Sequence, residues 1–304
     1  MRKLGSGWKL FISVMAIFLA FGLAFVIYLH FDVPLSSTLH DDYIFLGFIL
    51  ILTLLLIIVL LWFTRRLDSS ITRRHAEENT EMRRQLTQNI SHELKTPVAS
   101  IQGFLETLLQ NPDISEETRR MFLERSYAQT LRLSSLLQDI SQLNRMDDAP
   151  TAMQDFAPVD VAATIHLIAR ETALQLSRKH MSLDIRMPEK IVVSGNASLI
   201  YSIFRNLIDN AIAYAGEGVR IGIEATEARG HWNFIFSDNG TGVEAKHLNR
   251  LFERFYRVDK GRSRKMGGTG LGLAIVKNAV LLHGGSIKVS DAKPGLRFDF
   301  TLKK

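Results

Sequence analysis

The chain has 304 residues, of which 46% are hydrophobic and 22% are charged, and it contains no cysteine. The lack of cysteine excludes a disulfide-stapled secreted module and a zinc ribbon built on thiolates. The length allows about two soluble domains, or fewer if hydrophobic residues are concentrated in membrane spans.

The net charge of +6, from 37 basic and 31 acidic residues, is unevenly distributed along the chain. Residues 1–9 and 64–74 together contain seven basic residues and one acid, Asp68, so the whole surplus lies there. These segments flank two apolar runs, which is typical of charge kept on the cytoplasmic side of a membrane. A face shaped for a nucleic-acid duplex is not indicated, and we expect no nucleic-acid partner.

The two apolar runs, residues 10–29 and 43–63, contain no charged residue. Each has about the 20 residues that a helix needs to cross a bilayer. A cleaved signal peptide is the alternative for the first run, but the run is longer than a signal core and no small-residue cleavage pattern follows it. The loop 30–42 has three Asp and no Lys or Arg, so we expect residues 1–63 to form a membrane hairpin with both chain ends in the cytoplasm.

Residues 64–81 are polar and favour a helical linker, after which apolar residues recur at steps of three and four up to Leu108. Asn111-Pro112-Asp113 interrupts this first helix, and Ser115 is a candidate cap for a second helix that runs to about Met146. The second helix offers one apolar side, made of Leu123, Tyr127, Leu131, Leu137, Ile140 and Leu143. A hairpin of residues 82–146 buries little alone, so we expect a homodimer in which two hairpins form a four-helix bundle.

After residues 147–150 the sequence alternates between helical and strand patterns. We expect helices near 160–179, 197–214 and 271–283, and strands near 182–187, 190–194, 219–226, 231–237, 285–290 and 296–302. Because the strands occur in pairs, a mixed sheet covered on one face by helices is favoured over a doubly wound parallel sheet.

His92 is the first candidate for chemistry. It lies two residues from both Ile90 and Leu94 of the apolar stripe, so it is predicted to project into water. Glu93 could accept a hydrogen bond from one ring nitrogen and leave the other as a nucleophile. A lone exposed histidine usually has no function, but Pro97 within the same helix costs about 3 kcal/mol, and this predicts a local bend at a site.

Two glycine-rich segments and a pair of amides suggest nucleotide binding. Residues 238–242 follow a predicted strand, and residues 267–273 open a predicted helix, where backbone N–H groups can bind phosphate. Such a turn alone is weak evidence, and no Walker sequence is present. Asn206 and Asn210 share one helix face, and their amide oxygens are suitable magnesium ligands, although such residues are more often ordinary surface groups. The basic segment 260–265 is either a solvated loop or a mobile lid.

Taken in order, these motifs resemble those of the sensor histidine kinases of bacterial two-component systems. The resemblance covers about residues 82–304, with an H-box at 89–97, an N-box at 206–214, glycine boxes at 238–242 and 268–272, and an F-box at 252–257. It implies a dimerisation and phosphotransfer domain over 82–146 and an ATP-binding α/β sandwich of the gyrase and chaperone type over 151–304. It also implies a bacterial inner membrane location.

The resemblance assigns a role to each matching residue. His92 would accept the phosphoryl group, Glu93 would act as the base that orients it, and Thr96 would position water in a phosphatase reaction. The acceptor of the phosphoryl group from His92 would be an aspartate in the receiver domain of a response regulator. For ATP and Mg²⁺ the implied residues are Asn206, Asn210 as the metal ligand, Tyr214 on the adenine, Asp238 at the exocyclic amine, Arg257 at phosphate, and the glycines Gly240, Gly242, Gly268, Gly270 and Gly272.

One position departs from the family pattern, because Ala213 stands where lysine commonly precedes the N-box tyrosine. Only 28 positions separate Phe63 from His92, which leaves no room for a HAMP module. Two other functions stay open. A gyrase-like ATP hydrolase would need a glutamate where this chain has Asn206, and a silent ATP-binding scaffold is conceivable because of Ala213.

Overall fold

The computed structural model describes residues 86–147, 155–259 and 268–304, with isolated positions at 53, 54, 56, 58, 59, 62 and 84. By internal contacts the chain divides into residues 1–85 and residues 86–304. The expected membrane spans and linker lie almost entirely outside the described residues. Within the described part, no helix has the length and hydropathy that crossing a bilayer requires.

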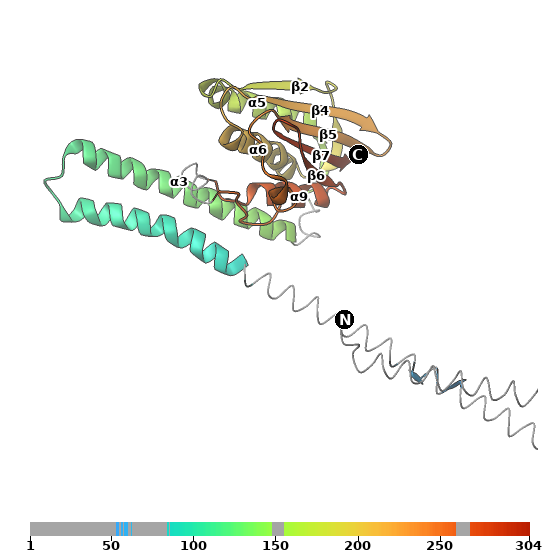
Figure 1. The fold of residues 1–304 in the computed structure, drawn as a ribbon, viewed down its shortest axis with the longest axis horizontal. Coiled ribbons are helices and arrows are strands. Elements are labelled where there is room, and N and C mark those ends of the chain that lie inside the picture. Colours follow the sequence, from blue (N-terminus) through green and yellow to red (C-terminus); the bar gives the residue numbers. More distant parts are fainter. Residues whose placement is uncertain are drawn as a thin grey trace, which may run out of the picture. The chain divides into compact units, whose positions relative to one another are not determined.

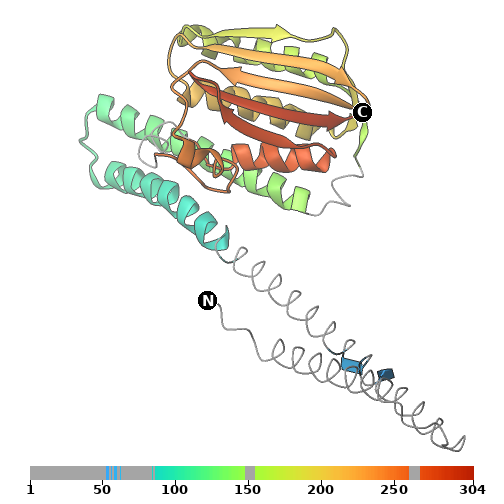
Figure 2. The same ribbon diagram turned by 45° about the vertical axis from the view of Figure 1, so that its right-hand side comes forward.

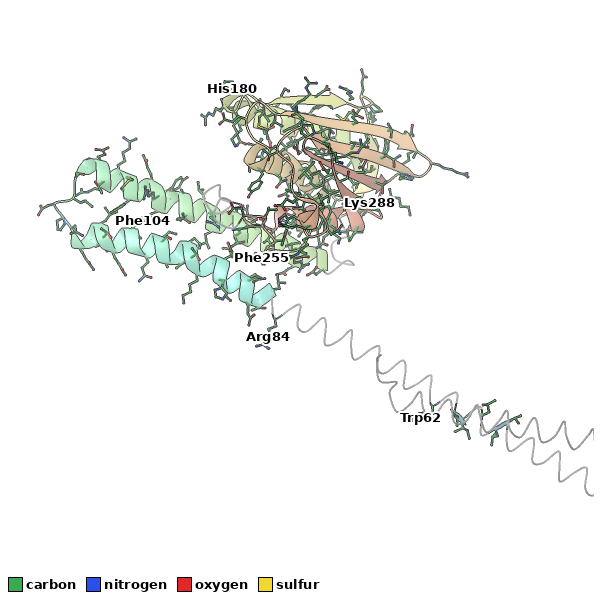
Figure 3. The ribbon with its side chains drawn as sticks, viewed as in Figure 1. Trp62, Arg84, Phe104, His180, Phe255 and Lys288 are labelled. Carbon is green, nitrogen blue, oxygen red and sulfur yellow. The ribbon has the colours of Figure 1, made fainter. Side chains whose placement is uncertain are left out.

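The second unit begins with a helical hairpin. A helix across residues 86–110 is followed by a short turn and by α3 (Glu116–Asp147). Ser115 caps α3, since its Oγ accepts the N–H of Thr118 over 3.3 Å, and Glu116 and Glu117 lie in the positive first turn. The two helices pack through Phe104 and Phe122, whose ring centroids are 5.3 Å apart. Figure 3 labels Phe104 on the first of these helices.

The first helix continues through Pro97, which is buried. The local bend expected at this proline stays a prediction. In α3 the apolar residues separate into two groups. Leu136, Leu143 and Met146 are buried in one core with the C-terminal domain, and α3 contacts α9 there. The other group is exposed and consists of Leu123, Tyr127, Leu131 and Leu137.

The C-terminal domain, residues 155–304, has an α/β fold (Figure 1). Its elements in chain order are β1 (Ala157–Asp160), α5 (Val161–Arg178), β2 (Ser182–Arg186), β3 (Val192–Gly195), α6 (Ala197–Tyr214), β4 (Arg220–Ala228), β5 (His231–Asp238), α7 (Ala245–Leu248), α9 (Gly272–Leu282), β6 (Ile287–Asp291) and β7 (Leu296–Lys303). A five-stranded sheet has the order β2-β4-β5-β7-β6, and β1 pairs with β3 in a separate ribbon. Figure 2 shows the strands of this sheet in one layer and α5, α6 and α9 in another.

The layers follow from the sequence pattern. Every second residue of β5 and β7 is buried, so one face of the sheet packs against the helices. At the centre of that core, the ring of Phe234 stacks on Phe300 with centroids 5.2 Å apart, and Phe204 of α6 meets Phe234 edge-on. Side chains cap the two longer helices, since Asp160 accepts N–H groups of α5 and Asn196 accepts one of α6.

The predicted architecture agrees with this fold. The sheet is mixed, because β2 is parallel to β4 and the other neighbours are antiparallel. Each predicted helix and strand of the domain is present, with ends displaced by a few residues. The sequence pattern did not predict β1, a four-residue strand, or α7, a single helical turn. Both are too short to show a period.

Candidate active site

His92 lies on the exposed side of the first hairpin helix, as the apolar stripe predicts. Its neighbours Ile90 and Leu94 are partly buried, and Leu94 packs against the hydrophobic core. One turn further on, Thr96 donates a hydrogen bond from Oγ1 to the carbonyl of His92 over 3.2 Å. The imidazole of His92 is therefore open to solvent.

A cavity of about 310 Å³ lies in the C-terminal domain, between α6, the loop after β5, residues 251–259 and the glycine-rich loop 268–272. This is the size of a small-molecule site. The predicted nucleotide-binding residues that line it are Asn206, Asn210, Tyr214, Asp238, Gly242, Arg257, Gly268, Gly270 and Gly272. Gly240 does not line the cavity, but its N–H donates to Oδ1 of Asp238 over 2.9 Å.

Asp238 is the buried acid of the cavity, with 7% of its surface exposed. Its Oδ1 accepts the N–H of Gly240 and, over 3.4 Å, the N–H of Leu296. Burial raises the pKa of Asp238 above the usual value of 3.8, and the two backbone donors oppose that shift. Because both donors use the same oxygen, Oδ2 is left as the acceptor for a ligand amine.

Gly240 holds this arrangement in place through its lack of a side chain. A Cβ at that position would lie 2.4 Å from the carbonyl oxygen of Ala215, which is backbone and cannot move aside. Thr241, next in the loop, donates its N–H to the same carbonyl over 3.1 Å. The loop after β5 is thus fixed against the end of α6, and only glycine fits at the closest approach.

The N-box residues Asn206, Asn210 and Tyr214 recur every four residues on α6 and line the cavity together. Asn206 donates from Nδ2 to the carbonyl of Ser202 over 2.8 Å, which directs its Oδ1 away from its own helix. A Cβ on Gly272 would lie 2.6 Å from that Oδ1. Amide oxygens facing a cavity fit a hard cation such as Mg²⁺, so these residues are suitable to hold one.

The glycine-rich loop leads directly into α9, which has no side-chain cap. Gly270 has φ +75°, and its carbonyl accepts the N–H of Phe255 over 2.8 Å. Phe255 itself has φ 64°, a left-handed conformation that is unusual for a bulky residue. This backbone bond places the segment containing Arg257 against the loop, beside helix N–H groups that favour an anion.

Arg257 connects the cavity to the hairpin. Its side chain is 6% exposed, and its Nη2 donates to the carbonyl of Gly268 over 2.6 Å. The same Nη2 donates to Oε2 of Glu93 over 3.2 Å. Since Glu93 follows His92 in the helix, this ion pair brings the H-box to the wall of the nucleotide cavity.

Several polar contacts between the hairpin and the C-terminal domain have no signal in the sequence. Thr269 donates to Asp139 over 2.7 Å, and burial raises the pKa of this aspartate. Arg254 makes a two-pronged ion pair with Asp147, with N–O distances of 2.7 and 3.2 Å. A polar residue on an amphipathic helix carries no sequence signal for such a distant partner, so these contacts could not be inferred from spacing.

Ala213 lines the cavity at the position where the family pattern has lysine. Among the described lining residues, Arg257 is the only basic one, while Asp209, Asp238 and Asp259 are acidic. The basic segment 260–265 lies outside the described residues. Arg257 is thus the cation that the described part of the cavity offers to an anionic ligand.

Comparison with known families decides the assignment. The His Kinase A (phospho-acceptor) domain matches residues 82–149, and the histidine kinase-, DNA gyrase B- and HSP90-like ATPase family matches residues 195–304. The chain belongs to the sensor histidine kinases. The H-box of this histidine kinase lies within the first matched region, and both glycine boxes lie within the second.

Curated relatives agree with the family matches. The chain is 36% identical over 220 residues to the sensor-like histidine kinase SenX3 of Mycolicibacterium smegmatis, which covers 72% of this chain and 56% of the relative. It is 39% identical over 235 residues to the phosphate regulon sensor protein PhoR of Pseudomonas aeruginosa, which covers 76% of this chain and 51% of the relative. The chain spans about half the length of these relatives.

Solved structures show the same fold. The histidine kinase AdeS of Acinetobacter baumannii matches with a TM-score of 0.57 and 22% identity, over 70% of this chain and 97% of that chain. The histidine kinase ThkA, crystallised in complex with the response regulator protein TrrA, matches with a TM-score of 0.58 and 18% identity, over 72% of this chain and 61% of that chain. At these identities the likeness concerns the fold alone.

Proposed function

We propose that this chain phosphorylates its own His92 from Mg-ATP and passes the phosphoryl group to an aspartate in the receiver domain of a response regulator. One observation carries the proposal: Arg257 lines the cavity and also donates to Glu93 over 3.2 Å, next to His92. The phosphate-binding cation and the accepting helix are therefore neighbours. Phosphoryl transfer depends mainly on such positioning and on charge neutralisation.

The residues divide the reaction between them. Asp238 accepts a hydrogen bond from the adenine amine through Oδ2, and Tyr214 packs on the ring. Arg257 and the N–H groups at the start of α9 bind phosphate oxygens and stabilise the negative charge that they carry during the transfer. A ring nitrogen of His92 attacks the γ-phosphorus, the bond to the ADP oxygen breaks, and Glu93 takes up the proton from the other ring nitrogen.

Asn206 and Asn210 would hold Mg²⁺, which neutralises phosphate charge when bound. The direction of Oδ1 of Asn206, fixed by its bond to Ser202, supports this role.

The second half of the reaction uses the exposure of His92. A carboxylate of the receiver domain attacks the phosphorus, the N–P bond breaks, and the imidazole is regenerated. If the chain also acts as a phosphatase, Thr96 would position the water that hydrolyses the acyl phosphate of the regulator. ThkA, a similar fold, was crystallised with a response regulator, and this supports a receiver domain as the partner.

The proposal includes a membrane topology and an oligomeric state. The charge pattern of residues 1–74 supports two membrane spans in the bacterial inner membrane, with residues 86–304 in the cytoplasm. A homodimer is supported by the exposed apolar residues of the hairpin. A reporter fused after residue 304 and another inserted in the loop 30–42 test the topology, and protection of the first but not the second from external protease is expected.

Incubation of the full chain with γ-labelled ATP and Mg²⁺ tests the kinase. We expect protein-bound label that is labile in acid and stable in alkali, that is lost in His92→Gln, and that moves to a receiver domain on addition. Phosphate release without protein label would favour an ATP hydrolase, and neither label nor release would favour a silent scaffold. Thr96→Ala separately tests the phosphatase, since it should retain autophosphorylation and lose dephosphorylation of the regulator.

A further inference from the structure

Glu93 has two arginine partners, and they come from different parts of the unit. Arg257 reaches it from the C-terminal domain over 3.2 Å, and Arg132 reaches it from α3 over 3.4 Å. Both guanidinium groups donate through Nη2 to the same carboxylate oxygen, Oε2. The exposed fractions are 20% for Glu93, 14% for Arg132 and 6% for Arg257, so solvent screens the cluster only weakly.

The two arginine partners of Glu93 differ in their relation to the nucleotide cavity. Arg257 lines the nucleotide cavity, and a phosphate with its higher charge competes with Glu93 for the guanidinium. Arg132 does not line the cavity, and it lies on the same helical hairpin as Glu93. The pair of Arg132 and Glu93 lies within the hairpin, so it does not depend on contact with the C-terminal domain.

We propose that Arg132 is a positioning residue for phosphoryl transfer, which holds the carboxylate of Glu93 beside His92 while Arg257 is bound to phosphate. The inference rests on the proposed kinase function. Arg257 is then the exchangeable partner of Glu93, and Arg132 is the permanent one. Among the described residues of the hairpin, Arg132 is the cation that pairs with Glu93. Its loss would leave the carboxylate less firmly oriented during the transfer, and displacement of a base by about 1 Å can cost up to a hundredfold in rate.

The matched variants are Arg132→Gln, which removes the charge, and Arg132→Lys, which keeps it on a group without the planar fork. The control is Arg120→Gln, since Arg120 is also on α3 and pairs with Glu124 at 2.9 Å, but its side chain is 80% exposed. For Arg132→Gln we expect kcat for labelling of His92 to fall by about tenfold or more, with KM for ATP within about twofold of wild type. Arg132→Lys should recover part of the loss, and Arg120→Gln should match wild type.

A double-mutant cycle separates positioning from a general structural effect. If Arg132 acts through Glu93, Arg132→Gln has no further effect on kcat in a Glu93→Gln background. The unfolding midpoint and the binding of a non-hydrolysable ATP analogue, measured on the same variants, should stay close to wild type.

The outcomes distinguish this inference from the proposed function. A wild-type chain without acid-labile label overturns both. A labelled wild type together with an unchanged kcat in Arg132→Gln overturns the inference alone. Two other results would also overturn the inference alone. In one, Arg132→Gln lowers kcat as much in the Glu93→Gln background as in wild type. In the other, Arg132→Gln changes only KM for ATP. Each would show that Arg132 does not act through Glu93.

Discussion

The helical hairpin and the C-terminal domain differ in how far one chain can bury their apolar side chains. The 18-residue helix α6 buries seven residues, whereas the 32-residue helix α3 buries four. Three of those four belong to the same core as the C-terminal domain. The C-terminal domain, together with the end of α3, thus buries its apolar side chains within one chain, and the rest of the hairpin retains apolar surface that a second copy can cover.

The largest expected effect comes from charging that surface. Leu123 and Leu131 are 50% and 54% exposed and lie on one side of α3, so Leu123→Glu with Leu131→Glu should leave the single chain folded. In a dimer each carboxylate would be buried without a partner, at about 2 kcal/mol or more per site, which weakens dimerisation more than a hundredfold. Light scattering of the detergent-solubilised chain measures the change from dimer to monomer.

The C-terminal domain offers a matched control for this variant. Leu174 on α5 is 63% exposed, and Leu174→Glu should leave the dimer intact. If Leu174→Glu dissociates the dimer and the Leu123→Glu, Leu131→Glu variant does not, the dimer interface lies on the C-terminal domain and not on the hairpin.

The second prediction concerns the self-contained pocket. Asp238→Asn keeps Oδ1 for the N–H groups of Gly240 and Leu296 but replaces Oδ2 with an NH₂ group. That donor would face the donor amine of adenine, at a cost of about 1–3 kcal/mol, so we expect ATP to bind roughly tenfold to a hundredfold more weakly. Calorimetric titration with ATP measures it.

The same substitution should have the opposite effect on stability. Burial raises the pKa of Asp238 in the folded state, so the folded protein holds this proton more tightly than the unfolded chain. Stability is therefore lost as pH rises from the unfolded pKa through the folded pKa, and the ionised carboxylate is a cost at neutral pH. Asp238→Asn removes the cost, so its unfolding midpoint at pH 7 should exceed that of wild type, by an amount that shrinks toward about pH 4. Equal midpoints at pH 7 would contradict this.

The third prediction tests whether the pocket depends on the direction of one amide. In Gly272→Ala the new Cβ would lie 2.6 Å from Oδ1 of Asn206, and the flexible side chain must turn away. We expect kcat/KM for labelling to fall roughly tenfold or more, with the unfolding midpoint nearly unchanged. Adding Asn206→Ala to this variant should cause no further loss, and an additive loss would show that Gly272 acts in another way.

The same contrast explains how much of the fold could be predicted. In the C-terminal domain, β5 alternates strictly between buried and half-buried residues, and the sequence pattern located it within one residue. In the hairpin, the stripe that contains Leu123 and Tyr127 was also recognised, but these residues are exposed in one chain. A periodic pattern predicts which side of a helix is apolar, and it does not say which molecule will cover it.

For the site, the residues that share a short motif were placed correctly. Asn206 and Asn210 face one cavity because a helix brings residues four apart to the same side. The contacts of Glu93 with Arg132 and Arg257 could not be predicted, since 39 and 164 positions separate the partners. Their meeting depends on how the hairpin packs on the C-terminal domain, and that packing follows from shape rather than from local spacing.

The smallest expected effect lies in the hairpin. Gly103 is exposed within the helix across residues 86–110, and a Cβ there would have no atom within 4 Å. Glycine in such a position costs about 1 kcal/mol relative to alanine, so Gly103→Ala should raise the unfolding midpoint of the hairpin by a few degrees. Differential scanning calorimetry measures it, with the affinity of the chain for ATP as the control that should not change. A different outcome would place Gly103 at a close contact between two copies: Gly103→Ala would lower the unfolding midpoint of the dimer and raise that of the Leu123→Glu, Leu131→Glu monomer. The uncovered surface of the hairpin would then extend to its first helix.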